Sequence, residues 1–177
     1  MTLPRRTVLV GGPLALLSLP VLSASARAEA AARTLPPGTR LLLLRHFDRD
    51  GAHLGAAGLA RAAALPGVIA DLPLQALYTR PIGRNQDSAR PLAEARGLEM
   101  QLLGTASGDD GVAPQLLDLA AGRSVIWIGN TTNLRAIWEL LGLPGPAPTG
   151  YGELVVVEPG PDGRARVTDR RTVPATG

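Results

Sequence analysis

The sequence predicts an α/β domain in which a mostly parallel β-sheet lies between layers of helices on both faces, a three-layer sandwich. Three observations support this fold class. Short apolar runs alternate with longer segments of helical composition between residues 40 and 141. The first run, residues 40–44, is uninterrupted leucine after one arginine, which is typical of a strand buried on both faces. A turn sequence, Gly-Pro-Asp-Gly at residues 160–163, separates two β-prone runs near the C-terminus.

The first half of the domain alternates between strand and helix. Residues 40–44 are too few for a helix and follow the turn residues Pro-Pro-Gly, so they predict a strand. Residues 56–70 are rich in alanine and predict a helix, which the Pro-Gly pair at 66–67 should interrupt. We expect a short strand at residues 76–79 and a second helix at residues 85–96.

The second half continues the alternation and then changes to a hairpin. Residues 114–121 predict a helix with proline in its first turn, and residues 124–128 form a strongly β-prone run. Residues 133–141 predict a helix preceded by two threonines that can cap its first N–H groups. Residues 153–158 and 165–171 predict the two strands of the hairpin.

Three polar segments directly follow predicted strands of this sheet. They are residues 45–47, residues 80–84 and residues 129–132. In open α/β sheets, ligands bind beyond the carboxyl ends of the parallel strands. The sequence therefore predicts that these segments meet at one edge of the sheet and form the functional site.

The first 28 residues predict an export signal rather than part of the domain. Arg5 and Arg6 precede an apolar run at residues 7–24, and small residues then lead to an expected cleavage after Ala28. The paired arginines resemble a twin-arginine signal, which implies a periplasmic or otherwise exported protein.

An uncleaved membrane anchor is the alternative, because an apolar run of about 18 residues is near the minimum for a membrane span. Pro13, Pro20 and the glycine pair at 11–12 disfavour a stable spanning helix, so we expect no membrane span after cleavage. Residues 29–38 should then form a flexible lead-in, and residues 39–175 a single domain.

Charge and composition exclude several classes of function. The chain has 18 arginines, no lysine and 15 acidic residues, and removal of residues 1–28 takes away three arginines and no acid. The remaining chain is formally neutral, so its composition gives no reason to expect a nucleic-acid or anionic membrane partner. The absence of cysteine excludes thiol catalysis and thiolate metal sites, and only two histidines argue against a histidine-rich metal site.

Several motifs resemble those of one enzyme family. The apolar strand at residues 41–46, which ends in Arg-His, resembles the strand and Arg-His-Gly motif of the histidine phosphatase superfamily. Residues 54–62 resemble its Leu-Thr-x-x-Gly-x-x-Gln/Arg-Ala segment. Residues 79–89 resemble its Ser-Pro-Leu-x-Arg-Ala-x-Gln-Thr-Ala segment, with Arg84 at the place of the family's arginine.

The resemblance continues to the end of the predicted domain. Residues 125–129 resemble the strand and glycine that lead into the family's second catalytic histidine, and residues 151–157 resemble the strand that follows. The motifs occur in the family's order over residues 39–172. The resemblance thus implies the phosphoglycerate mutase-like form of the α/β sandwich.

The resemblance also implies the hydrolysis of a phosphomonoester through a phosphohistidine. Oxygens of the phosphoryl group repel a nucleophile until their charge is neutralised, and guanidinium groups neutralise it with a planar fork of donors. Arg45 and Arg84 would hold these oxygens while a neutral nitrogen of His46 attacks phosphorus. Such a reaction needs no metal and no organic cofactor.

Further site residues are open to two interpretations each. The spacing of Arg49 is similar to that of the acid phosphatase branch's Arg-His-Gly-x-Arg motif and implies a third phosphate ligand, although a solvated loop arginine is the commoner explanation of a single charge. Asp109 and Asp110 are candidate general acids for the leaving group, or an Asp-Asp-Gly turn that caps the next helix. Asp48 is a third candidate acid.

Two residues depart from the family pattern. Asn130 follows Gly129 where the family has its second catalytic histidine, and an amide can donate a hydrogen bond but carries no charge. Loss of one such donor typically costs about 3 kcal/mol of transition-state stabilisation. Phe47 stands where glycine is usual, so its ring should either narrow the pocket or pack inward.

The other histidine and the tryptophans receive structural interpretations. We expect His53 on an exposed loop, and Trp127 and Trp138 in the core.

The motifs and the departures from them leave two functions open. One is a phosphatase with His46 as nucleophile, and the other is a catalytically weak or inactive relative that binds a phosphorylated ligand or partner.

Overall fold

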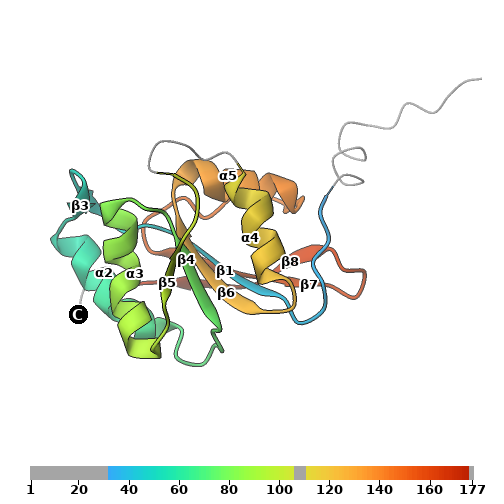
Figure 1. Ribbon diagram of the computed structural model, residues 1–177, viewed down its shortest axis with the longest axis horizontal. Coiled ribbons are helices and arrows are strands. Elements are labelled where there is room, and N and C mark those ends of the chain that lie inside the picture. Colours follow the sequence, from blue (N-terminus) through green and yellow to red (C-terminus); the bar gives the residue numbers. More distant parts are fainter. Residues whose placement is uncertain (1–31, 106–110, 176–177) are drawn as a thin grey trace, which may run out of the picture.

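The computed structural model describes residues 32–105 and 111–175 of the chain. Figure 1 shows a sheet with α2 and α3 side by side against one face and α4 and α5 against the other. The strands are β1 (Arg40–Arg45), β2 (Arg49–Asp50), β3 (His53–Leu54), β4 (Ala76–Thr79), β5 (Met100–Leu102), β6 (Ser124–Gly129), β7 (Glu153–Pro159) and β8 (Ala165–Thr172). The helices are α2 (Ala56–Val68), α3 (Gly83–Arg96), α4 (Val112–Ala120) and α5 (Thr131–Leu140).

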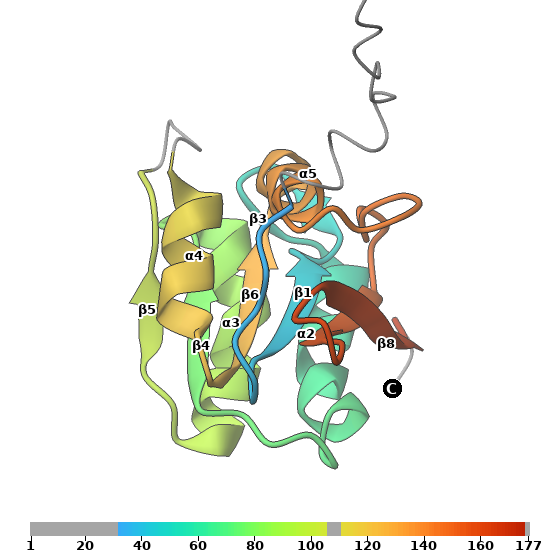
Figure 2. The same ribbon diagram turned by 90° about the vertical axis from the view of Figure 1, so that its right-hand side faces the viewer.

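The sheet is mostly parallel, as the sequence predicted. Its order is β5-β4-β6-β1-β7-β8, and the pairs β5-β4, β4-β6 and β6-β1 are parallel. The β7–β8 hairpin joins the far side of β1 in antiparallel orientation. Every residue of β4 and β6 is buried, because helices cover both faces of these strands (Figure 2). The predicted fold class is confirmed.

The element boundaries differ from the prediction by a few residues. The helix expected at residues 56–70 continues through Pro66 to Val68, and the proline, which has no N–H, removes one backbone hydrogen bond from its last turn. The two threonines expected to cap α5 are its first helical residues, and Asn130 is the N-cap. Strand β5 and the small β2–β3 hairpin were not predicted.

The start of the described chain packs on the domain. The Leu35 side chain is only 2% exposed, and its N–H donates to the Gly163 carbonyl at 2.8 Å. The Arg33 N–H donates to the Leu140 carbonyl at 2.8 Å. The described part of the expected flexible lead-in is therefore bound to the β7–β8 turn and to α5. The expected signal, residues 1–28, lies outside the described residues.

The aromatic residues lie in the two apolar cores. Trp127 and Trp138 are buried on the α4–α5 face, and each indole N–H has an acceptor, Asn133 Oδ1 and the Gly145 carbonyl. Both core predictions are confirmed. Phe47 is fully buried on the α2–α3 face, so the ring packs inward.

Among the described residues, no helix is long and apolar enough to cross a membrane.

Candidate active site

The predicted segments meet at the carboxyl edge of the parallel strands. Arg45 at the end of β1 lies opposite Gly129 at the end of β6, and the His46 N–H donates to the Gly129 carbonyl at 2.8 Å. On the other side of β6, Thr79 at the end of β4 lies opposite Ile128, and its hydroxyl donates to the Ile128 carbonyl at 2.8 Å. The parallel register thus brings three loops together that are far apart in the sequence.

His46 is buried at this edge with a defined tautomer. Its Nδ1 lies 2.8 Å from the Phe47 carbonyl oxygen, which only accepts, so Nδ1 carries the proton. The Nε2 lone pair then accepts a hydrogen bond from Arg84 Nε at 3.2 Å. The imidazole is thus neutral, with its unprotonated nitrogen directed at the arginine that the resemblance implies as a phosphate ligand.

The surroundings of His46 stabilise the neutral form. Burial lowers the pKa of His46 to about 4, against a smaller upward effect of the hydrogen bond to the Phe47 carbonyl. The positive charges of Arg45, Arg84 and Arg49 make smaller contributions to the same downward shift of the pKa. At neutral pH, the imidazole is therefore a base and a nucleophile rather than a cation.

Arg84 is held in the first turn of α3. Its N–H donates to the Ala52 carbonyl at 2.9 Å, which ties the β2–β3 hairpin to the helix. One turn later, the Ser88 hydroxyl donates to the Arg84 carbonyl at 2.8 Å and accepts from the Phe47 N–H at 3.0 Å. Ser88 thus links the helix that carries Arg84 to the turn that carries His46. Sequence analysis did not identify this role.

Arg45 is anchored on the side opposite Arg84, by a loop that precedes β7. Its Nη1 donates to the Thr149 carbonyl at 2.8 Å and its Nη2 to the Tyr151 hydroxyl at 3.3 Å. Its Nε is buried and has no hydrogen-bond partner among the residues that the structure describes. Within the described part of the chain, neither Arg45 nor Arg84 has a carboxylate within ion-pair distance. Their positive charges are therefore available to bind an anion.

Arg80 adds a third guanidinium that sequence analysis did not single out. It follows β4, its side chain is 2% exposed, and its Nη2 donates to the Thr105 carbonyl. Burial and the nearby charge of Arg84 lower the pKa of Arg80. The sequence did mark this position as unusual, because Arg80 stands where the family segment that residues 79–89 resemble has serine.

The remaining candidates lie apart from His46 or are already paired. Arg49 is exposed and donates to the Gly51 carbonyl at 3.4 Å, so its effect on His46 is electrostatic. Asp48 accepts from Arg61 Nε at 2.8 Å. Asp109 and Asp110 lie outside the described residues.

His53 is exposed, as predicted, but it belongs to β3 rather than to a loop. Its imidazole Nδ1 lies 2.7 Å from Asp87 Oδ2 on α3. Gly83 is its neighbour at the start of this helix. Asp87 stands three residues after Arg84 in α3, so the pair is a neighbour of Arg84 on the helix surface.

Asn130 occupies the end of β6, directly beside the backbone that binds His46. It is the N-cap of α5, and its N–H donates to Asn133 Oδ1 at 2.8 Å. A β-carbon on Gly129 would overlap the Trp127 indole and the Asn133 amide, so only glycine fits at this point of the strand.

No cluster of three potential metal ligands occurs in the residues that the structure describes.

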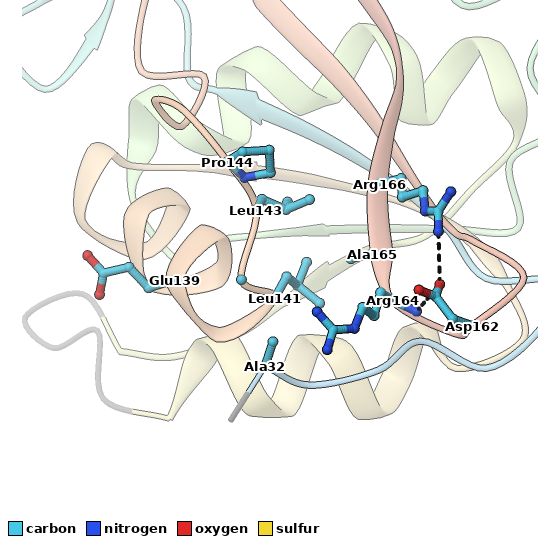
Figure 3. A pocket seen from close by; sticks show the side chains of 10 residues that line it. Ala32, Glu139, Leu141, Leu143, Pro144, Asp162, Arg164, Ala165 and Arg166 are labelled. Atoms are coloured by element: carbon cyan, nitrogen blue, oxygen red, sulfur yellow. Dashed lines mark hydrogen bonds and ion pairs between the residues drawn. The ribbon is translucent and has the colours of Figure 1, made fainter. Parts of the chain in front are cut away.

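A separate pocket lies away from this site, between the C-terminal end of α5 and the β7–β8 turn. Figure 3 shows Leu141, Leu143 and Pro144 on one side of it and Arg166, hydrogen-bonded to Asp162 at 3.2 Å, on the other. Its lining mixes apolar groups with both signs of charge. It shares no residue with the surroundings of His46.

Comparison with known proteins gives matches among solved structures alone, since no protein-family model and no curated sequence matches. A mycobacterial glucosyl-3-phosphoglycerate phosphatase in complex with inorganic phosphate has a TM-score of 0.58 and 18% identity. The alignment covers 77% of this chain and 98% of that chain. The same phosphatase with VO3 has a TM-score of 0.59 and 16% identity, over 76% of this chain and 99% of that chain.

A phosphoserine phosphatase from Entamoeba histolytica, in complex with 3-phosphoglyceric acid, is similar to the same degree. Its TM-score is 0.57 at 18% identity, and the alignment covers 76% of this chain and 97% of that chain. These phosphatases are members of the histidine phosphatase superfamily. The domain described here therefore has the same phosphoglycerate mutase-like α/β fold as these phosphatases.

Proposed function

We propose that this protein is a histidine phosphatase that hydrolyses a phosphomonoester through a phosphohistidine on His46. The observation that carries the proposal is the neutral imidazole, buried beside two arginines that have no carboxylate partner among the described residues. The nucleophile is in its reactive protonation state, and the donors for its substrate are already in place.

The reaction follows from these contacts. Phosphoryl oxygens bind the buried Nε of Arg45 and the guanidinium of Arg84, which releases the His46 Nε2 lone pair from its hydrogen bond to Arg84. Nε2 attacks phosphorus, the bond to the leaving oxygen breaks, and that oxygen takes a proton from a general acid or from water. Water then attacks the phosphohistidine, which returns His46 and releases inorganic phosphate.

The comparisons support this type of ligand. The solved phosphatases with the same fold were crystallised with inorganic phosphate, VO3 and 3-phosphoglyceric acid. A tetrahedral or pentavalent oxyanion of this size suits a site whose donors are guanidinium groups. We therefore propose a phosphomonoester as the substrate, and Asp109 or Asp110 as the general acid, because Asp48 is paired with Arg61.

The test is hydrolysis of an aryl phosphate by the purified protein from residue 29 onward, with His46→Ala and His53→Ala in parallel. His53 is the matched control, since it is the other histidine and is exposed. We expect His46→Ala to abolish turnover and His53→Ala to preserve it. A rapid quench should trap phosphate on the wild-type protein as an acid-labile, alkali-stable adduct. Equal background rates in all three proteins would refute the proposal.

A second function is favoured by one residue. Asn130 supplies no positive charge at the end of β6, so the site could bind an oxyanion and turn it over slowly or not at all. Calorimetric titration with phosphate and vanadate, with Arg84→Ala as control, measures binding without turnover. A large gain in turnover for Asn130→His would show an intact scaffold in which one missing cation limits the rate.

We also propose that residues 1–28 direct export through the twin-arginine route to the periplasm. The supporting pattern is the Arg5-Arg6 pair ahead of an apolar run and a small-residue cleavage site. The test is cell fractionation of the full chain and of a variant with both arginines changed to lysine. Retention of the mature size and location by that variant would contradict the twin-arginine route.

A further inference from the structure

Tyr151 contacts both the nucleophile and the phosphate ligand of the site. Its ring centroid lies 4.2 Å from Arg45 Cζ and 5.8 Å from the centroid of the His46 ring, with the two ring planes tilted by 50°. We propose that Tyr151 is the positioning residue of this site: it fixes the Arg45 guanidinium for substrate and shields His46 from water. This inference rests on the proposed phosphatase function and assigns a residue to it.

The first part of the role concerns the direction of Arg45. A guanidinium has five N–H donors in one plane. Nη1 is bound to the Thr149 carbonyl, Nη2 to the Tyr151 hydroxyl, and the aromatic ring covers the guanidinium carbon. These contacts occupy the outer end of the guanidinium and one of its faces, and the buried Nε has no partner within residues 32–105 and 111–175. The free donor is thereby held in place before substrate arrives.

The second part concerns the hydration of His46. An aromatic ring next to an imidazole replaces water, and water is what stabilises the imidazolium form. In the described part of the chain, the charged groups that act on His46 are Arg45 from β1, Arg84 from α3 and Arg49 from β2, all of them positive. Removal of the Tyr151 ring would admit water and relieve the burial that keeps the imidazole neutral.

The loop that carries Tyr151 is itself well anchored. Gly152 has a φ of +80°, and a β-carbon there would overlap Arg61 and the Val173 carbonyl. The Val173 N–H donates to the Gly152 carbonyl at 2.8 Å, and the Gly150 N–H donates to Glu153 Oε2 at 2.9 Å. Both neighbours of Tyr151 are thus fixed, so the ring has a defined position against Arg45.

The experiment compares Tyr151→Leu, which removes the aromatic face, with Tyr151→Phe, which removes the hydroxyl alone. Thr149→Ala is the matched control on the same loop, because Thr149 contacts Arg45 through its backbone carbonyl. The chain has only two histidines, so NMR titration of the ligand-free proteins follows His46 and His53 individually. Vanadate affinity and the Arg45 Nε–H signal are measured on the same samples, and thermal melting verifies that each variant is folded.

We expect Tyr151→Leu to raise the titration midpoint of His46 and to weaken vanadate binding about two- to thirtyfold, the range for one cation–π contact. Tyr151→Phe should retain the wild-type midpoint and bind within about threefold, and Thr149→Ala should match the wild type. An unchanged midpoint and affinity in folded Tyr151→Leu would overturn the inference. If the wild type itself fails to bind vanadate, the phosphatase proposal fails, while the His46 midpoint and the Arg45 signal still decide the role of Tyr151.

Discussion

At the scale of single residues, the properties of His46 come from its neighbours rather than from the imidazole itself. The Phe47 carbonyl fixes the tautomer, burial disfavours the cation, and the nearby arginines add repulsion. A histidine with these surroundings resists protonation over most of the acidic range. This has a measurable consequence for the stability of the whole domain.

We predict that the wild-type protein loses stability as the pH falls from about 6.5 to about 4, and that His46→Asn removes part of this dependence. The unfolded chain binds a proton at His46 near pH 6.5, whereas the folded protein does so near 4. Protonation in this window therefore favours unfolding, by about 3 kcal/mol in total. The contribution is fully present above pH 6.5 and is lost as the pH falls toward 4.

Urea denaturation at several pH values between 7.5 and 4.5 measures this effect. His53→Asn, which removes the other histidine of the chain, is measured in parallel. Identical slopes for the wild type and His46→Asn would contradict the prediction.

A second residue-scale prediction concerns Ser88. Its hydroxyl is the acceptor of the buried Phe47 N–H, so Ser88→Ala leaves that donor unsatisfied and should cost about 1–3 kcal/mol of unfolding free energy. The turn that carries His46 should also loosen, with a lower kcat. Ser88→Thr keeps the hydroxyl and should recover most of the loss. Urea midpoints and aryl phosphate turnover test both effects.

At the scale of elements, the site depends on how strands end and helices begin. The ends of β1 and β6 meet through Arg45, Gly129 and the His46 N–H, while α3 and α5 start at Gly83 and Thr131 on either side. At Gly129, β6 passes so close to the Asn133 side chain of α5 that a β-carbon would overlap it. Its replacement therefore tests the strand end itself.

We predict that Gly129→Ala destabilises the domain by about 1–3 kcal/mol, because the added methyl group overlaps the Trp127 indole and the Asn133 amide. Gly67→Ala is the matched control. Gly67 lies inside α2 with open space around it, so alanine there should be neutral or stabilising by up to about 1 kcal/mol. Thermal and urea unfolding should therefore show a loss of stability for Gly129→Ala but none for Gly67→Ala, and an equal loss in both variants would contradict the prediction.

At the scale of the whole molecule, the sheet separates two apolar cores, and the chain before β1 belongs to one of them. Leu35 is buried in the α4–α5 core, and backbone hydrogen bonds hold the segment around it against α5 and the β7–β8 turn. We therefore expect the segment before residue 39, the predicted start of the domain, to contribute to its stability.

We predict that Leu35→Ala costs about 2–4 kcal/mol of unfolding free energy, as expected for a buried leucine. Arg33→Ala should cost less than about 1 kcal/mol, since its ion pair with Asp118 is largely exposed. A protein that starts at residue 32 should melt well above one that starts at residue 39. Equal melting temperatures for these two proteins would show that the segment adds no stability.

The sequence alone predicted much of the fold because the relevant signals are local. Uninterrupted apolar runs at Leu41 and Val125 indicate strands covered on both faces, and that requirement by itself demands helices on both sides of the sheet. Strand β5 escaped prediction because Met100, Gln101 and Leu102 are only three residues with no clear alternation. Their strand conformation comes from pairing with β4.

The sequence by itself predicted the α/β class, the edge of the sheet for the candidate site, and the motif residues Arg45, His46 and Arg84. The class and the edge follow from the alternation of local patterns along the chain, and the motif residues follow from the resemblance to a known family. Only the tertiary structure decided that Tyr151 lies against Arg45 and His46, and that Ser88 links Phe47 to α3. These contacts join residues 41 or more positions apart, and such partners are chosen by strand register and helix packing rather than by any local pattern.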